Sequence, residues 1–275
     1  SSEHPFDTYR ANLGPEYYSY DVGKAHVVAL NTVEYPVGTS YTGSLDERQL
    51  EWLRNDLAQV PANKLIVVAA HIPLLDYADQ GSSKHQVAQV KEVYELLSGR
   101  EAIALGGHTH SIENLRAGDR LEGWKDVMGV DELPFTHITA GAISGDWYSG
   151  TVLPQGYPAA LQRDGGRPGV LTLDITGDRV EERFTVRGED ESLQMALGVN
   201  TPRYRQWFAA HRSDVGSAPE YTDPLVVSRS DLEDTTWLTT NFWMGGTGST
   251  VTATLDGGEP VEAVRTQPMR GEGQK

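Results

Sequence analysis

Three of the eight histidines in this 275-residue chain stand at the ends of apolar runs. His71 closes "LIVVAAH" (65–71), and His108 and His110 belong to "GGHTH" (106–110). Neutral imidazole is a good ligand for zinc, iron, manganese and nickel. Two histidines at positions i and i+2 of extended backbone project to the same side, and preceding glycines let the backbone approach a ligand closely. The pattern predicts a metal site, built on nitrogen and oxygen ligands because the chain has no cysteine.

Other interpretations of these histidines stay open. A lone histidine at a strand end is more often hydrogen-bonded or solvent-facing than a ligand, and H-x-H alone is a weak pattern. His71, His108 and His110 could also form a mononuclear or structural metal site with an open position for water. We assign His26, which lies inside a strand pattern, to the structure. The histidines in polar segments we assign to the surface: His4, His85 and His211.

Strand and helix patterns alternate around the histidines. Residues 44–57 predict a helix with a capping box at Ser44 and Glu47 and an apolar stripe formed by three leucines: Leu50, Leu53 and Leu57. A second helix is predicted over 86–99, and buried strands over 65–70 and 101–105. Ligand sites of such sheets lie outside the carboxyl ends of the strands, where the three histidines would stand.

The remaining patterns predict mainly β structure. Hairpins are expected over 17–31 and 169–186, and a strand that breaks into a glycine-rich loop over 135–150. Beyond about residue 188 lysine disappears until Lys275 and threonine becomes frequent. We therefore expect two domains, 1–188 with α/β structure and 189–275 as a mainly-β accessory domain that contains a short helix near 204–211.

The stretches "VVAAHIPL" (67–74) and "GGHTH" (106–110) resemble two motifs of the calcineurin-like metallophosphoesterases, a strand-terminal His and a G-H-x-H. The similarity extends to "GPEYYSYDVG" (14–23), "YTGSLDERQLEWLRNDL" (41–57) and "ITAGAISGDWYSG" (138–150), roughly the first two-thirds of the chain. The resemblance implies that 1–188 is the C-terminal part of a four-layer α/β/β/α sandwich, followed by the smaller mainly-β domain.

The resemblance also implies a chemistry. His71 and His108 would bind one metal ion and His110 a second, the ions being divalent or trivalent zinc, iron, manganese or nickel. A metal-bound hydroxide would attack the phosphorus of a small phosphorylated substrate, as in two-metal catalysis. His137, Trp147 and Tyr148 fall where loops near the cleft could touch that substrate; the alternative is that all three are packing residues.

The chain departs from the family pattern in its early motifs. A D-x-H, a G-D-x-x-D and a G-N-H, which supply the other ligands, are absent from the 275 residues. We expect an upstream segment of the same protein to carry them, and the chain alone to be inactive. A competing hypothesis is a non-catalytic binding protein that retains the sandwich and uses its β domain as the working surface.

Composition excludes several partner classes. A net charge of −16 argues against a broad electrostatic grip on nucleic acid. The run "LIVVAA" (65–70) is far shorter than the roughly 20 residues of a membrane span, so we expect no span. The location stays open, because exported proteins need not carry disulfides; we favour a secreted or periplasmic location slightly over a cytoplasmic one.

Overall fold

The structure is a computed structural model that describes residues 6–35, 40–143, 152, 156, 162, 164–176, 179–211 and 227–265. The chain divides into two compact units. The first comprises Ser1–Glu191 with Met244–Lys275, and the second Ser192–Trp243.

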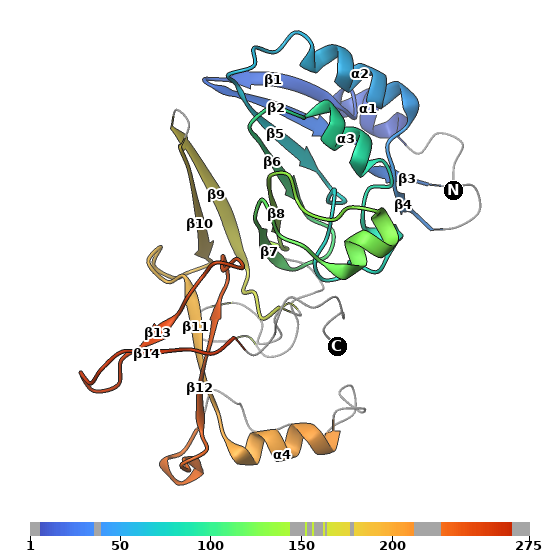
Figure 1. Cartoon of the computed structure of the whole chain (residues 1–275). Helices are drawn as coiled ribbons and strands as arrows, with labels where there is room; N and C mark the ends of the chain where they lie inside the picture. The colour runs from blue at the N-terminus through green and yellow to red at the C-terminus, as the bar shows by residue number, and fades with distance from the viewer. Residues whose placement is uncertain are drawn as a thin grey trace. The chain divides into compact units, whose positions relative to one another are not determined.

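A six-stranded sheet with the order β1-β2-β5-β6-β8-β7 forms the centre of the first unit (Figure 1). The inner strands run parallel, and the edge strands β1 and β7 pair antiparallel with their neighbours. The strands are β1 (Tyr18–Val22), β2 (Ala25–Leu30), β5 (Leu65–Ala70), β6 (Ala102–Gly106), β7 (Ile112–Leu115) and β8 (Thr136–Ala140). The predicted α/β class and the hairpin over 17–31 are confirmed.

Helices α2 (Glu47–Leu57) and α3 (Val90–Leu96) pack on one face of this sheet through the main hydrophobic core. The predicted stripe of α2 is confirmed, since Leu53 is fully buried and Leu57 nearly so. Burial of such a side chain stabilises the fold by roughly 1.5–3 kcal/mol. The stripe thus holds α2 against the sheet.

The predicted capping box of α2 is wrong. The helix begins at Glu47, and its N-cap is Asp46, two residues after Ser44, with Oδ1 accepting a hydrogen bond of 2.7 Å from the Gln49 amide. The Leu45 amide and the Ser44 hydroxyl instead donate to Gln89 Oε1. These contacts hold residues 44–45 outside the helix, which leaves Asp46 to cap it.

The predicted helix over 86–99 is also shorter than expected. Gln86 is extended, and the next two residues bond to distant strands and loops: the Val87 amide donates to Leu74 O and the Ala88 amide to Gly43 O. The helix therefore starts at Val90, because tertiary hydrogen bonds compete successfully for the backbone of the segment before it.

The opposite face of the sheet carries a smaller apolar cluster of Ala25, Leu65, Val67 and Ile103. The predicted hairpin over 169–186 is confirmed as β9 (Gly169–Thr176) and β10 (Arg179–Val186). Ile175 and Val180 of this hairpin pack against the cluster, so the hairpin covers part of the second face.

The first unit also contains short elements and a segment from late in the chain. The short elements are α1 (Asp7–Leu13), β3 (Val33–Glu34), β4 (Thr42–Gly43), η1 (Ser83–His85), the π-helix η2 (Trp124–Met128), β13 (Thr252–Ala253) and β14 (Val261–Glu262). Asn114 Nδ2 donates to Met244 O at 2.9 Å, and Thr247 Oγ1 to Asp119 Oδ1 at 2.6 Å. Residues 244–249 are thereby bonded to β7 and the loop after it.

The second unit consists of β11 (Met195–Asn200), α4 (Pro202–His211), η3 (Arg229–Asp231) and β12 (Trp237–Phe242), with β11 and β12 antiparallel. The Arg205 guanidinium donates to Asn200 O and Thr235 O and lies 4.1 Å from the centre of the Trp237 ring. The assignment of 189–275 to one accessory domain stays a prediction.

In the described part of the chain, no helix is long and apolar enough to cross a bilayer.

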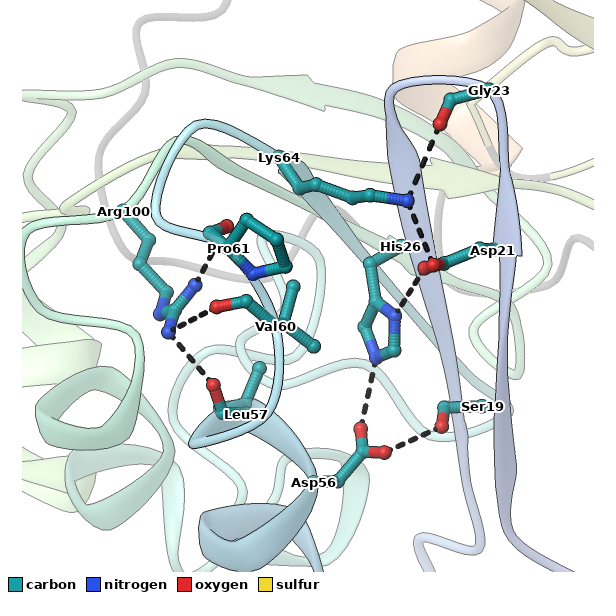
Figure 2. Close-up of polar contacts among 10 residues, drawn as sticks. All are labelled: Ser19, Asp21, Gly23, His26, Asp56, Leu57, Val60, Pro61, Lys64 and Arg100. Atoms are coloured by element: carbon teal, nitrogen blue, oxygen red, sulfur yellow. Dashed lines mark hydrogen bonds and ion pairs between the residues drawn. The ribbon is translucent and has the colours of Figure 1, made fainter.

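His26 lies at the start of β2 in a polar network that joins three elements (Figure 2). Its Nδ1 is 2.8 Å from Asp21 Oδ1 on β1, and its Nε2 is 2.9 Å from Asp56 Oδ2 on α2. Ser19 donates to the other oxygen of Asp56, and Lys64 pairs with Asp21 and lowers the pKa of that carboxyl group. The network supports the structural interpretation of His26.

Candidate functional site

The first two candidate ligands come from neighbouring parallel strands. His71 follows β5 and His108 stands two residues after β6, and the Gly107 amide donates to His71 O at 3.0 Å. Gly106 permits this approach, because a Cβ there would lie 2.6 Å from Cβ of Pro73. The "HIP" and "GGH" sequences therefore pack directly against each other at the carboxyl edge of the sheet.

The expected extended backbone at "HTH" is wrong. Strand β6 ends at Gly106, and His108 and His110 adopt positive φ values of 70° and 52°. Residues other than glycine rarely adopt this left-handed backbone conformation, which costs about 1–3 kcal/mol per residue. The two histidines are thus presented by a tight turn over 107–111, and the turn, not strand alternation, sets their directions.

His108 lies at the centre of a row of three imidazole rings. Its Nδ1 is 3.3 Å from His71 Nε2, and its Nε2 is 2.8 Å from His85 Nδ1. A neutral imidazole has one donor and one acceptor nitrogen, so a row of neutral rings can satisfy both contacts. His110 lies near enough to lower the pKa of His108.

The assignment of His85 to the surface is wrong. His85 is partly buried at the end of η1, and the loop between β5 and α3 brings it to His108. Its polar neighbours in the sequence gave no sign of this position. Only the tertiary course of the loop places a fourth histidine beside the predicted three.

Tyr41 and Lys84 complete the surroundings of the rings. The Tyr41 ring meets the His108 ring edge-on with centres 5.0 Å apart, and Lys84 Nζ lies 4.5 Å from the centre of the Tyr41 ring. Neither residue belongs to a sequence pattern that points to this site. Lys84 brings a positive charge to a group of otherwise neutral side chains.

Desolvation keeps the partly buried ring of His108 neutral. Burial first, and then the neighbouring His71, His85, His110 and Lys84, lower the pKa of His108 to about 4. Burial also lowers the pKa of His71. A neutral imidazole offers the lone pair that a metal ion requires, so these rings are in the ligand form at pH 7.

The donor chemistry fits a transition metal, although the ligand set is incomplete. As the side chains stand, the described residues form no group of three or more His, Asp or Glu that could hold a metal ion. His71, His108 and His85 contact one another through ring nitrogens, and these same nitrogens would bind a metal ion. A bridging carboxylate, as the family resemblance implies, would have to come from elsewhere.

His137 lies on β8 in the core, with 3% of its surface exposed. Its Nδ1 donates to Phe135 O at 2.9 Å, and its Nε2 is 2.9 Å from the Tyr94 hydroxyl. Both nitrogens are thus occupied, which favours a core histidine over a substrate residue. Trp147, Tyr148, His4 and the side chain of His211 lie outside the described residues.

A cavity of about 650 Å³ lies apart from these residues, between the segment after α1 and helix α2. Its lining residues are Arg10, Gly14, Pro15, Glu16, Tyr17, Tyr18, Ser19, Arg48 and Trp52. It contains none of the histidines, and Arg10 there is already bound by Glu16. We assign it no part in the chemistry.

Comparisons with known proteins identify a family for this chain. A family model described as the C terminal of calcineurin-like phosphoesterase matches residues 137–275. Among solved structures, a purple acid phosphatase isolated from yellow lupin (Lupinus luteus) seeds is similar, with a TM-score of 0.39 and 17% sequence identity. The match covers 64% of this chain and 31% of that one, so the chain spans about a third of its length. No curated protein matches. By the family model, which extends over half of its residues, the chain belongs to the calcineurin-like phosphoesterases.

Proposed function

We propose that this chain is part of a metal-dependent phosphoester hydrolase and that it supplies the histidine side of a two-metal site. The observation that carries the proposal is the row of imidazoles at the carboxyl edge of the sheet, where His71 and His108 from neighbouring strands lie 3.3 Å apart. The low pKa of His108 supports it, because the ring is available as a ligand at neutral pH.

In this proposal His71 and His108 bind one metal ion and His110 the other. The bound ions, zinc, iron, manganese or nickel, would supply a hydroxide that is nucleophilic near pH 7 and would neutralise charge on the phosphoryl oxygens. The protein's own contribution is to hold the rings neutral and in place. Lys84 adds positive charge that favours a small phosphorylated substrate at the site.

The test uses protein in which the D-x-H, G-D-x-x-D and G-N-H motifs are present, on the same polypeptide or as a second one. We expect two metal ions per molecule and phosphatase activity against a synthetic aryl phosphate. His71→Ala, His108→Ala and His110→Ala should each lower the activity more than roughly 100-fold, since even residues that only support a metal ligand cost 10–100-fold.

His26→Gln is the matched control, because His26 is a buried histidine of the same sheet with both nitrogens bonded to carboxylates. It should retain the metals and the activity. Protein that binds no metal with all motifs present would overturn the proposal and leave the non-catalytic binding protein as the better account. One metal bound only by His71, His108 and His110 would instead indicate a mononuclear site.

A further inference from the structure

Glu113 is a buried carboxyl group on β7 that the proposed chemistry does not use. Its Oε2 accepts a hydrogen bond of 2.8 Å from the Tyr77 amide, and its Oε1 accepts one of 3.3 Å from the Ala78 amide. These amides lie near the start of the loop 76–86, which ends with His85 and Gln86. The carboxyl group of Glu113 is therefore fastened to the backbone of the loop that carries His85.

The same carboxyl group is bonded to the turn that carries the other histidines. Ser111 Oγ donates to Glu113 Oε1 at 2.6 Å, and it lies 3.1 Å from Thr109 Oγ1. Thr109 stands between His108 and His110 and is itself buried. Glu113 thus contacts, directly or through one hydroxyl, both segments that meet at the pair His85–His108.

Asp76 extends the network on the loop side. Its side chain accepts a hydrogen bond from the Asp79 amide, and its amide donates to Gln86 Oε1. Gln86 in turn donates to the carbonyl oxygens of Gln80 and Ser82. The loop is thereby bonded into one unit around two buried side chains, Asp76 and Gln86, the second adjacent to His85.

The two carboxyl groups also interact with each other. Burial, and then the neighbouring Asp76, raise the pKa of Glu113 well above its ordinary value. Protonation of Glu113 removes one of the two buried charges and so favours the pair in the core.

We propose that Glu113 is a positioning residue: its carboxyl group holds the loop 76–86, and with it His85, against the turn 107–111 that presents His108 and His110. The chemistry that the positioned histidines perform rests on the proposed function, whereas their placement rests on the hydrogen bonds alone. Glu113 acts through the backbone of the loop, at Tyr77 and Ala78, and through Ser111 on the turn.

The experiment is long-range ¹H–¹⁵N and NOE spectroscopy of the imidazole rings in the 275-residue chain, without metal. His85→Gln and His108→Gln assign the signals. Wild-type protein should show the NOE between the rings of His85 and His108. Glu113→Ala should lose it and shift the nitrogen resonances of both rings, while the signals of His26 and His137 stay in place.

Glu113→Gln tests the same contacts with little change in volume. The amide retains one acceptor oxygen but presents NH₂ where Tyr77 or Ser111 donates, so its effect should lie between those of wild type and Glu113→Ala. If Glu113→Ala does not fold, Glu113→Gln and Ser111→Ala decide the matter, since each breaks one arm of the network. Asp56→Asn is the control at the other network, and it should shift His26 alone.

Unchanged His85 and His108 signals in a folded Glu113→Gln and Ser111→Ala would overturn the proposal. Displacement of all histidines together would also overturn it, because that result would reveal a general loss of structure. Neither result depends on metal or activity. Failure of the proposed hydrolase function would appear separately, as absence of metal and turnover in protein whose histidines are correctly placed.

Discussion

At the scale of single residues, the partners of each histidine decide what it does. His108 stands in a group of imidazoles at the sheet edge, where a neutral ring can take a metal ion, whereas His137 has both nitrogens bonded in the core. His26 lies between two carboxylates at the start of its strand. Histidines on one sheet thus serve different purposes because their partners differ.

The buried state of His137 predicts a pH dependence of stability. Burial lowers its pKa to about 4 from the ordinary 6.5, so the unfolded chain binds a proton more readily than the folded one. Its contribution to the free energy of unfolding is fully present above about pH 6.5 and is lost as the pH falls toward 4. The change amounts to about 3 kcal/mol at 1.4 kcal/mol per pKa unit.

Urea unfolding of wild type and His137→Gln between pH 7 and pH 4 measures this contribution. The variant should be less stable at pH 7 and should lose less stability on acidification. His108 has a lowered pKa too, so some dependence of the same sign should remain. Parallel curves for the two proteins would show that His137 does not carry the effect.

At the scale of elements, short patterns in the sequence predict which segments form, and tertiary hydrogen bonds set where they begin. Helix α2 has the expected apolar stripe, but Gln89 holds residues 44–45 and leaves Asp46 as the cap. Helix α3 loses its predicted first turn to bonds with Leu74 and Gly43. Cap and start positions depend on partners far away in the sequence.

The N-cap of α2 gives a direct test of this distinction. Asp46→Ala should destabilise the protein by about 1 kcal/mol, the usual cost of losing a side-chain cap. Ser44→Ala removes only a 3.4 Å contact with Gln89 and should cost less than about 0.5 kcal/mol. Chemical denaturation compares the free energies of unfolding of the two variants. A larger loss of stability for Ser44→Ala would support the predicted capping box at Ser44 instead.

At the scale of the first unit, residues from late in the chain are bonded to the sheet that bears the site. Glu182 on β10 accepts hydrogen bonds from the two terminal guanidinium nitrogens of Arg116, at 2.7 and 2.8 Å. It also accepts one from Asn114 Nδ2, at 2.9 Å. Asn114 also binds Met244 O, and the loop after Arg116 binds Thr247. Glu182 therefore joins β10 to β7 and to Arg116 after it, and Asn114 links this group to the segment 244–249.

Removal of this carboxylate should loosen the late segment. Glu182→Ala leaves the Arg116 guanidinium without this acceptor and leaves Asn114 Nδ2 with Met244 O, and we expect a loss of about 2 kcal/mol, as for hydrogen bonds to charged groups. Cleavage by a protease within 244–249 should become faster. The neighbouring Glu181→Ala removes an exposed pair with Arg179 and should change stability by less than about 0.5 kcal/mol. Equal effects of the two variants would contradict this role of Glu182.

The class of the fold and two central residues of the candidate site could be predicted from local sequence patterns. Apolar runs, the leucine stripe of α2 and the turn residues are local features, and each reports directly on the segment that contains it. His71 and His108 could be predicted together because the carboxyl ends of neighbouring parallel strands meet at one edge.

The residues that join them depend on the path of distant loops. His85 and Tyr41 come from loops, and a loop's path depends on contacts that its own residues do not encode by spacing. The turn at 107–111 replaced an expected extended segment, and Glu113 holds it to the loop of His85 through bonds that span 35 and 36 residues. Such long-range hydrogen bonds have no local pattern, so the fold alone reveals them.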